Sequence, residues 1–141
     1  MSKIVSLSLS SIALLFFSGC GDSGPKIVEV AGRATYQQKP VQRILVTFSP
    51  ETGRPSVSSL TDADGKFELT YEGTRKGAQV GTHTVTIEYY PTDPGEEQDI
   101  VEGKKKRPAA VEAILKKYGS GKEKKTVEIK QAVKDLDLQL D

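Results

Sequence analysis

The sequence of 141 residues is poor in the side chains that perform covalent and metal chemistry. It has one cysteine, one histidine, and neither tryptophan nor asparagine. A single cysteine excludes a disulfide within the chain, and one thiolate cannot build a cysteine-based zinc site. A catalytic zinc needs about three protein ligands, mostly histidines. We therefore expect neither enzymatic activity nor a cofactor.

An excess of charge of one sign is also absent. The chain has 20 lysines and arginines against 19 aspartates and glutamates. A nucleic-acid-binding domain usually carries a clear basic excess. The composition therefore predicts no nucleic-acid partner.

There is only one long apolar run, at residues 4–17. A single basic residue, Lys3, precedes this run, and the first acidic residue is Asp22. A membrane-spanning helix needs about 20 apolar residues, so this run is short for a span. A basic start, a short apolar stretch and small residues after it are typical of a secretory signal peptide, which we place at residues 1–19.

The only cysteine, Cys20, lies directly after this segment, in the stretch "FSGC". The stretch resembles the lipobox of bacterial lipoproteins, with Ser18 and Gly19 as the small residues before the cysteine. The resemblance implies that the peptide is cut before Cys20, that the cysteine carries lipid, and that residues 20–26 form a tether. The protein would then be exported and anchored to the cell membrane or the outer membrane, facing the periplasm or the exterior. The alternative is an ordinary signal peptide with an incidental cysteine.

From residue 27 onward, apolar and polar residues alternate as in half-buried strands. The clearest case is "THTVTIEYY", residues 82–90, where Val85, Ile87 and Tyr89 share a face with His83. The Asp-Gly pair in "DADGKFEL" predicts a hairpin turn, because glycine adopts a positive φ at little cost. The predicted strands are residues 27–36, 43–49, 56–61, 67–71, 82–90, 124–130 and 133–141.

Two segments differ from this pattern. Residues 91–107 combine prolines, glycines, several acids and the basic run "KKKR", which predicts a long exposed loop. Because the acids lie beside the basic run, we interpret that run as solvated and not as a surface for anionic lipid or polymer. Residues 108–119 have apolar residues at helical spacing, with Pro108 at the start and Gly119 at the end, and predict a short helix.

Seven short strands and one helix predict an all-β fold. The expected architecture is a seven-stranded antiparallel sandwich over residues 27–141, with the short helix between the last strands.

The order of motifs in this domain resembles the carboxypeptidase regulatory-like, or transthyretin-like (prealbumin-like), domain. The similarity runs from Val28 to Leu140 through "GRATYQQKPVQRILVTFS", "SLTDADGKFEL" and "GTHTVTIEY". The second stretch matches the family run T-D-x-D-G-x-F-x-L almost without change. The family is a binding or structural sandwich, so the resemblance implies a structural module or one that binds an envelope protein or a glycan.

Two alternatives remain beside this interpretation. Asp62 and Asp64 are weak candidates for calcium ligands, which would make the protein a calcium-stabilised adhesion domain. A tight turn whose aspartates accept backbone N–H groups explains the same residues. The other alternative is a transthyretin-like hydrolase, but those enzymes use several histidines and this chain has only His83. We interpret His83 as a packed residue.

Tyr90 is the weak candidate for a partner-binding residue. Strand alternation turns Tyr90 outward if Val85 and Ile87 face the core. The alternative is that Tyr90 packs under the loop of residues 91–107.

Overall fold

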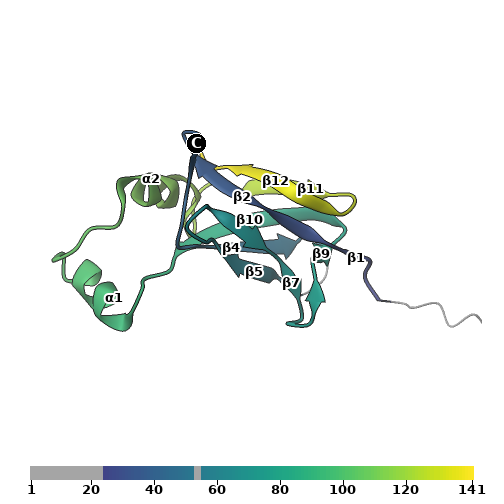
Figure 1. Ribbon diagram of the computed structural model, residues 1–141, viewed down its shortest axis with the longest axis horizontal. Coiled ribbons are helices and arrows are strands. Elements are labelled where there is room, and N and C mark those ends of the chain that lie inside the picture. The colour runs from purple at the N-terminus through teal and green to yellow at the C-terminus, as the bar shows by residue number, and fades with distance from the viewer. Residues whose placement is uncertain (1–23, 53–54) are drawn as a thin grey trace, which may run out of the picture.

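We describe residues 24–52 and 55–141 from a computed structural model, in which strands predominate (Figure 1). One four-stranded sheet has the order β11-β10-β4-β5, and each neighbouring pair is antiparallel. Its strands are β4 (Ile44–Pro50), β5 (Val57–Leu60), β10 (Gly81–Tyr89) and β11 (Lys125–Ile129).

The second sheet has the order β12-β2-β3, and β6 also pairs with β2. Its strands are β2 (Val30–Tyr36), β3 (Lys39–Pro40), β6 (Lys66–Glu68) and β12 (Val133–Gln139). Two short pairs complete the strands: β1 (Ile27–Val28) with β9 (Ala78–Gln79), and β7 (Thr70–Tyr71) with β8 (Arg75–Lys76).

The observed strand arrangement differs from the expected one in two ways. Several predicted strands are divided, so the described residues contain twelve strand segments and not seven. The expected antiparallel pairing is wrong for β12, which runs parallel to β2 with Val133 opposite Val30 and Leu136 opposite Gly32. Alternation along a strand identifies its buried face but contains no information on the direction of its neighbour.

The two sheets share one hydrophobic core. The predicted inward residues Ile44, Val46 and Phe48 of β4 are fully buried, as are Val85 and Ile87 of β10. Side chains of the other sheet meet them: the ring centroids of Phe48 in β4 and Phe67 in β6 are 5.9 Å apart. Further core residues include Val30, Ala34, Leu69, Tyr71, Ile129, Leu138 and Leu140.

Residues 91–107 are not the long loop that the sequence predicts, because they contain α1 (Pro94–Val101). Asp93 is the N-cap, and its carboxylate accepts a hydrogen bond from the backbone N–H of Glu96 at 3.0 Å. Pro94 stands in the first turn, where its missing N–H costs nothing. The prolines and glycines that suggested a loop therefore belong in part to a helix start.

The predicted helix at residues 108–119 is confirmed as α2 (Ala109–Tyr118), with Gly119 as its C-cap. Val111 and Ile114 are buried against the core. Both helices lie at one end of the molecule, whereas β1, the first strand, lies at the opposite end (Figure 1).

Candidate functional site

An open groove of about 840 Å³ runs along the outer face of the second sheet. Because side chains alternate along a strand, the buried Val30 and Ala34 of β2 leave Ala31, Arg33 and Thr35 on the opposite, outward face. β6 and β12 flank β2, and β5 adds Ser59 and the half-exposed Leu60.

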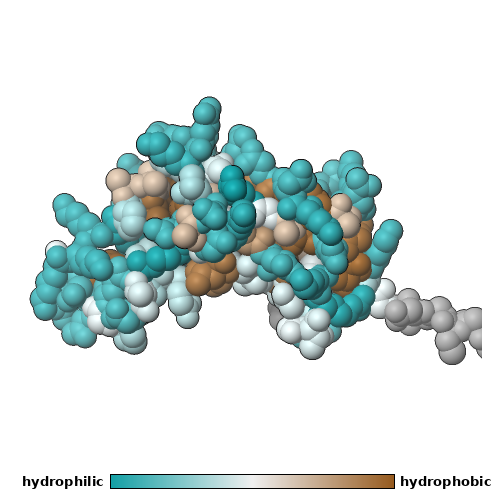
Figure 2. Space-filling view, in the orientation of Figure 1, coloured by the Kyte–Doolittle hydropathy of each residue, from teal (hydrophilic) through white to brown (hydrophobic). Residues whose placement is uncertain are grey.

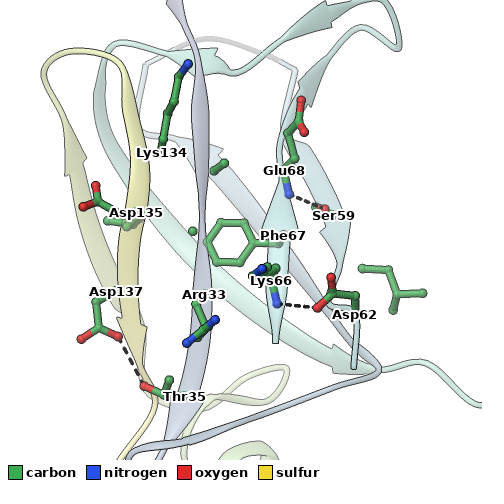
Figure 3. A pocket seen from close by; sticks show the side chains of 14 residues that line it. Arg33, Thr35, Ser59, Asp62, Lys66, Phe67, Glu68, Lys134, Asp135 and Asp137 are labelled. Carbon is green, nitrogen blue, oxygen red and sulfur yellow. Dashed lines mark hydrogen bonds between the residues drawn. The ribbon is translucent and has the colours of Figure 1, made fainter. Parts of the chain in front are cut away.

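The groove carries charges of both signs. Figure 3 shows Asp135 and Asp137 on the β12 side and Asp62 and Glu68 on the other, with Arg33 between them. Lys66 and Lys134 also line it. The hydroxyl of Thr35 donates to Asp137 at 3.4 Å, and Ser59 accepts the backbone N–H of Glu68 at 3.2 Å. This surface can hydrogen-bond to a polar ligand along its length.

The floor of the groove depends on a close approach of strands at Gly32. A Cβ atom built on Gly32 would lie 2.2 Å from the backbone oxygen of Leu136 and 2.9 Å from the Phe67 ring. Phe67 is the residue opposite Gly32 on β6, and its side chain is buried. Glycine is therefore required here because a larger side chain has no room, and not because the backbone adopts a positive φ.

A second site lies where α1 meets the ends of β4 and β10, and it is centred on the buried carboxylate of Glu96. This carboxylate forms ion pairs with Arg43 and, at 2.8 Å, with Lys105. It also accepts the backbone N–H of Thr92 at 2.6 Å and the hydroxyl of Tyr89 at 3.3 Å. We call these five residues the Glu96 cluster.

The contacts of the Glu96 cluster strongly favour the charged form of the carboxylate. Hydrogen bonds from Lys105, from the Thr92 backbone and from Arg43 hold the pKa of Glu96 far below its usual range. The same contacts raise the pKa of Lys105, whereas burial raises the pKa of the Tyr89 hydroxyl. The cluster therefore stays ionised at neutral pH and joins α1 to the first sheet.

Arg43 occupies an unusual backbone position in this cluster. Its φ is +61°, a left-handed conformation that is uncommon for residues other than glycine. Backbone hydrogen bonds fix it on both sides, from its own N–H to Thr61 at 3.1 Å and from the N–H of Tyr90 to its carbonyl at 2.9 Å. The guanidinium lies 5.2 Å from the centre of the Tyr89 ring, and that of Arg107 lies 6.0 Å from it.

The sequence interpretation missed the Glu96 cluster. The pattern Asp93-x-x-Glu96 is a signature of a helix N-terminus and could have indicated the helix. Nothing in the sequence indicates that Glu96 pairs with Arg43, because 53 residues separate them.

The two aspartates of "DADG" lie in the turn before β6, and Asp62 accepts hydrogen bonds from the backbone there. One carboxylate oxygen of Asp62 accepts the N–H groups of Asp64 at 2.9 Å and Lys66 at 2.8 Å. Among the described residues, no group of three or more histidine, cysteine or acidic side chains is placed to hold a metal ion. The interpretation as a tight turn accounts for Asp62.

We expect Asp62→Ala to destabilise the protein by about 1 kcal/mol, because two backbone N–H groups lose their acceptor. Asp64→Ala is the matched control in the same turn and should change stability by less than about 0.5 kcal/mol. Urea unfolding of both variants measures the difference. Equal losses, or a melting temperature that rises with added calcium, would instead favour the calcium interpretation.

Tyr90 faces outward, with 55% of its surface exposed, and Val85 and Ile87 are fully buried as the alternation requires. The alternative, that Tyr90 packs under residues 91–107, is wrong. Tyr89 is the tyrosine that contacts this segment, through Glu96 and Arg107.

His83 is 1% exposed and packs edge-on against Phe48, with ring centroids 6.1 Å apart. Its Nε2 is 2.7 Å from the backbone oxygen of Gln79. The interpretation of His83 as a packed residue is confirmed, and the only imidazole of the chain cannot reach a substrate at the surface.

Cys20 and the predicted signal peptide at residues 1–19 lie outside the described residues. The last three residues of the predicted tether, residues 24–26, are exposed. Within residues 24–52 and 55–141, neither helix has the length and apolar character needed to cross a membrane.

Comparisons with family models, with curated proteins and with solved structures find no match to this chain. The resemblance to the carboxypeptidase regulatory-like domain therefore stays a prediction.

Proposed function

We propose that this chain is a membrane-anchored lipoprotein of the cell envelope, whose β domain is non-catalytic and acts as a structural or partner-binding module. The observation that carries the proposal is the stretch "FSGC", which ends at Cys20 directly after an apolar segment. The first strand begins at Ile27 and residues 24–26 before it are exposed, so a short segment would separate the modified cysteine from the domain.

The lipid gives the proposed anchor its strength. Each buried methylene contributes about 0.8 kcal/mol, and stable anchoring takes two acyl chains or an equivalent second signal. A lipoprotein cysteine carries two or three chains, so the β domain needs no membrane-binding surface of its own.

We expect Cys20→Ala to move the protein from the membrane fraction to the soluble fraction of the cells, and to remove its labelling by a radioactive fatty acid. The reason is that the thiol accepts the lipid and cannot be replaced by another side chain. Ser23→Ala, in the same segment, is the control and should remain lipidated. A Cys20→Ala protein that stays with the membrane in amounts equal to the control would refute the anchor.

We extend the proposal to the fold. The domain is assigned to the sandwich architecture of the carboxypeptidase regulatory-like family, with the two sheets as its layers. The shared core supports this, since Phe48 and Phe67 from different sheets pack on one another. The parallel pairing of β12 with β2 is a departure from the all-antiparallel form expected from the sequence.

The groove on the second sheet supports a binding role. Its carboxylates, lysines and hydroxyls offer hydrogen bonds along three adjacent strands, which suits an extended polar ligand. The one aromatic residue in its lining, Phe67, is buried and offers no exposed ring for a sugar to stack on. We therefore favour a polypeptide of the envelope over a glycan. Tyr90 is exposed outside the groove and stays a separate candidate contact.

The same geometry gives little support to hydrolysis. The only histidine is buried in the core, and Asp62 is bound to backbone N–H groups. A general base must lie within hydrogen-bond reach of the proton that it removes, and His83 cannot do so for a surface ligand.

A further inference from the structure

The two helices enclose a hollow of about 650 Å³ that is separate from the groove on the second sheet. Four basic residues line it, Lys105, Lys106, Arg107 and Lys116, together with one acid, Glu112, and apolar residues that include Ile100 and Ala113. We call this surface the basic hollow. In the space-filling view, the end of the molecule that carries α1 is mainly hydrophilic (Figure 2).

Charge is distributed unevenly around the basic hollow. Residues 104–125 contain nine lysines and arginines but only two acids, although the chain as a whole is nearly balanced. The acids of residues 93–102 neutralise part of this charge, since Glu96 pairs with Lys105. The carboxylate of Glu96 is buried in its own cluster, and Glu102 pairs with Lys104 at 2.5 Å.

The basic side chains of the hollow are only partly neutralised. Lys105 pairs with Glu96, and Arg107 lies 3.4 Å from Glu112. Lys106 and Lys116 are exposed, and neither forms an ion pair within the part of the chain that the structure describes. Two cations are therefore available to a ligand.

The position of the basic run relative to α2 also favours the binding of an anion. Lys105, Lys106 and Arg107 immediately precede the N-terminus of α2, the end of a helix that disfavours cations. The N-cap, Pro108, supplies no side-chain acceptor for the first turn. A bound carboxylate would relieve the mutual repulsion of these positive charges.

The residues that line the hollow limit the classes of ligand that it can bind. It contains no aromatic ring, so a nucleobase or a sugar would have no face to stack on. Its cations are spread over the hollow, which suits several carboxylates on a flexible chain better than one compact anion. Ile100, Ala109 and Ala113 also line the hollow and can contact small apolar side chains between those carboxylates.

The residues that line the hollow belong to α1, α2 and the segment between them, at the end of the molecule opposite β1 (Figure 1). If the proposed anchor at Cys20 holds, the lipid surface to which the protein is attached is at the far end. This makes the headgroups of that membrane a poor match for the hollow. The position of the hollow relative to the membrane depends on the proposed anchor, whereas the charges that line the hollow do not.

We infer that the basic hollow is a docking site for an acidic polypeptide segment of an envelope partner, held by Lys106 and Lys116 with Arg107. The segment would lay its carboxylates against the cations and small side chains against the apolar residues. Exposed charge pairs of this kind act mainly on the rate of association and on specificity, so the binding should weaken as salt is added.

The test uses the full chain, purified in a neutral detergent, and a fluorescein-labelled poly-L-glutamate probe. Fluorescence anisotropy should show binding at about 50 mM salt that weakens several-fold at about 300 mM. The double variant Lys106→Glu/Lys116→Glu should lose affinity by about tenfold or more, and Lys106→Gln/Lys116→Gln by less.

The control is Lys26→Glu/Lys39→Glu, which makes the same change of charge at exposed lysines outside the hollow. It should bind the probe like the wild type. Equal losses in both Glu variants would mean attraction to overall charge, and no binding by the wild type would exclude a docking site. Displacement of the probe by glycerol phosphate at an equal concentration of anionic groups would assign the hollow to a lipid headgroup. Each of these results overturns the inference, and none of them bears on the membrane fractionation of Cys20→Ala.

Discussion

We expect Gly32→Val to destabilise the protein by about 3 kcal/mol, because the new side chain has no space between β2 and β12. The first atom of that side chain would lie 2.2 Å from the Leu136 backbone oxygen, 2.8 Å from the Leu136 Cβ and 2.9 Å from the Phe67 ring. One of these contacts is with backbone, so a change of rotamer cannot relieve it. β12 must move away from β2, which breaks the parallel pairing.

Ala31→Val is the matched control, since it enlarges the side chain of the neighbouring residue of β2 on the outward face. A β-branched residue suits a half-buried strand position, so the change in stability should be within about 0.5 kcal/mol. Urea unfolding of the two variants gives the comparison. If Gly32→Val unfolds at the same urea concentration as Ala31→Val, the strands separate more easily than the close approach implies.

The second large effect concerns the Glu96 cluster. We expect Glu96→Gln to release α1 from the first sheet, because Arg43 and Lys105 lose the carboxylate that both contact. Amide hydrogen exchange in residues 94–101 should then accelerate by about tenfold or more, while exchange in β4 and β10 stays slow. Glu97→Gln, at an exposed position of the same helix, removes the same charge and should leave the exchange of α1 nearly unchanged.

The Glu96 cluster also gives the stability of α1 a defined dependence on pH. The pKa of Glu96 is lowered by folding, so its stabilising contribution is fully present above the usual glutamate pKa of about 4.5. The contribution declines as the pH falls below that value, because the unfolded chain then binds a proton that the folded chain does not. The stability of α1 in Glu96→Gln, measured by hydrogen exchange, should not show this decline at low pH. A loss of stability of equal size in the variant would mean that other carboxylates cause the pH dependence.

Local pattern was enough to predict much of the fold. Alternation placed β4 and β10 correctly, with Phe48 and Ile87 inward, and helical spacing placed α2. These features depend on neighbours within a few residues, so a short window of sequence contains them.

The errors have physical causes that a short window does not contain. Pro94 and Gly95 break a helix interior but are tolerated in a first turn, and only the Asp93 cap distinguishes the two cases. The cluster around Glu96 and the groove beside Arg33 both form from segments far apart in the sequence. Their geometry is decided by how the sheets pack, which alternation alone cannot specify.

The parallel pairing of β12 with β2 has a consequence for the order in which the molecule can form. A ribosome makes residues 30–36 early and residues 133–139 late, yet these two segments are neighbours in one sheet. Until the late segment is made, one side of β2 has no hydrogen-bond partner and behaves as an open edge. Pairing of such distant segments is slow, because the long intervening chain must first be confined. The second sheet is therefore completed only after residues 133–139 have been made.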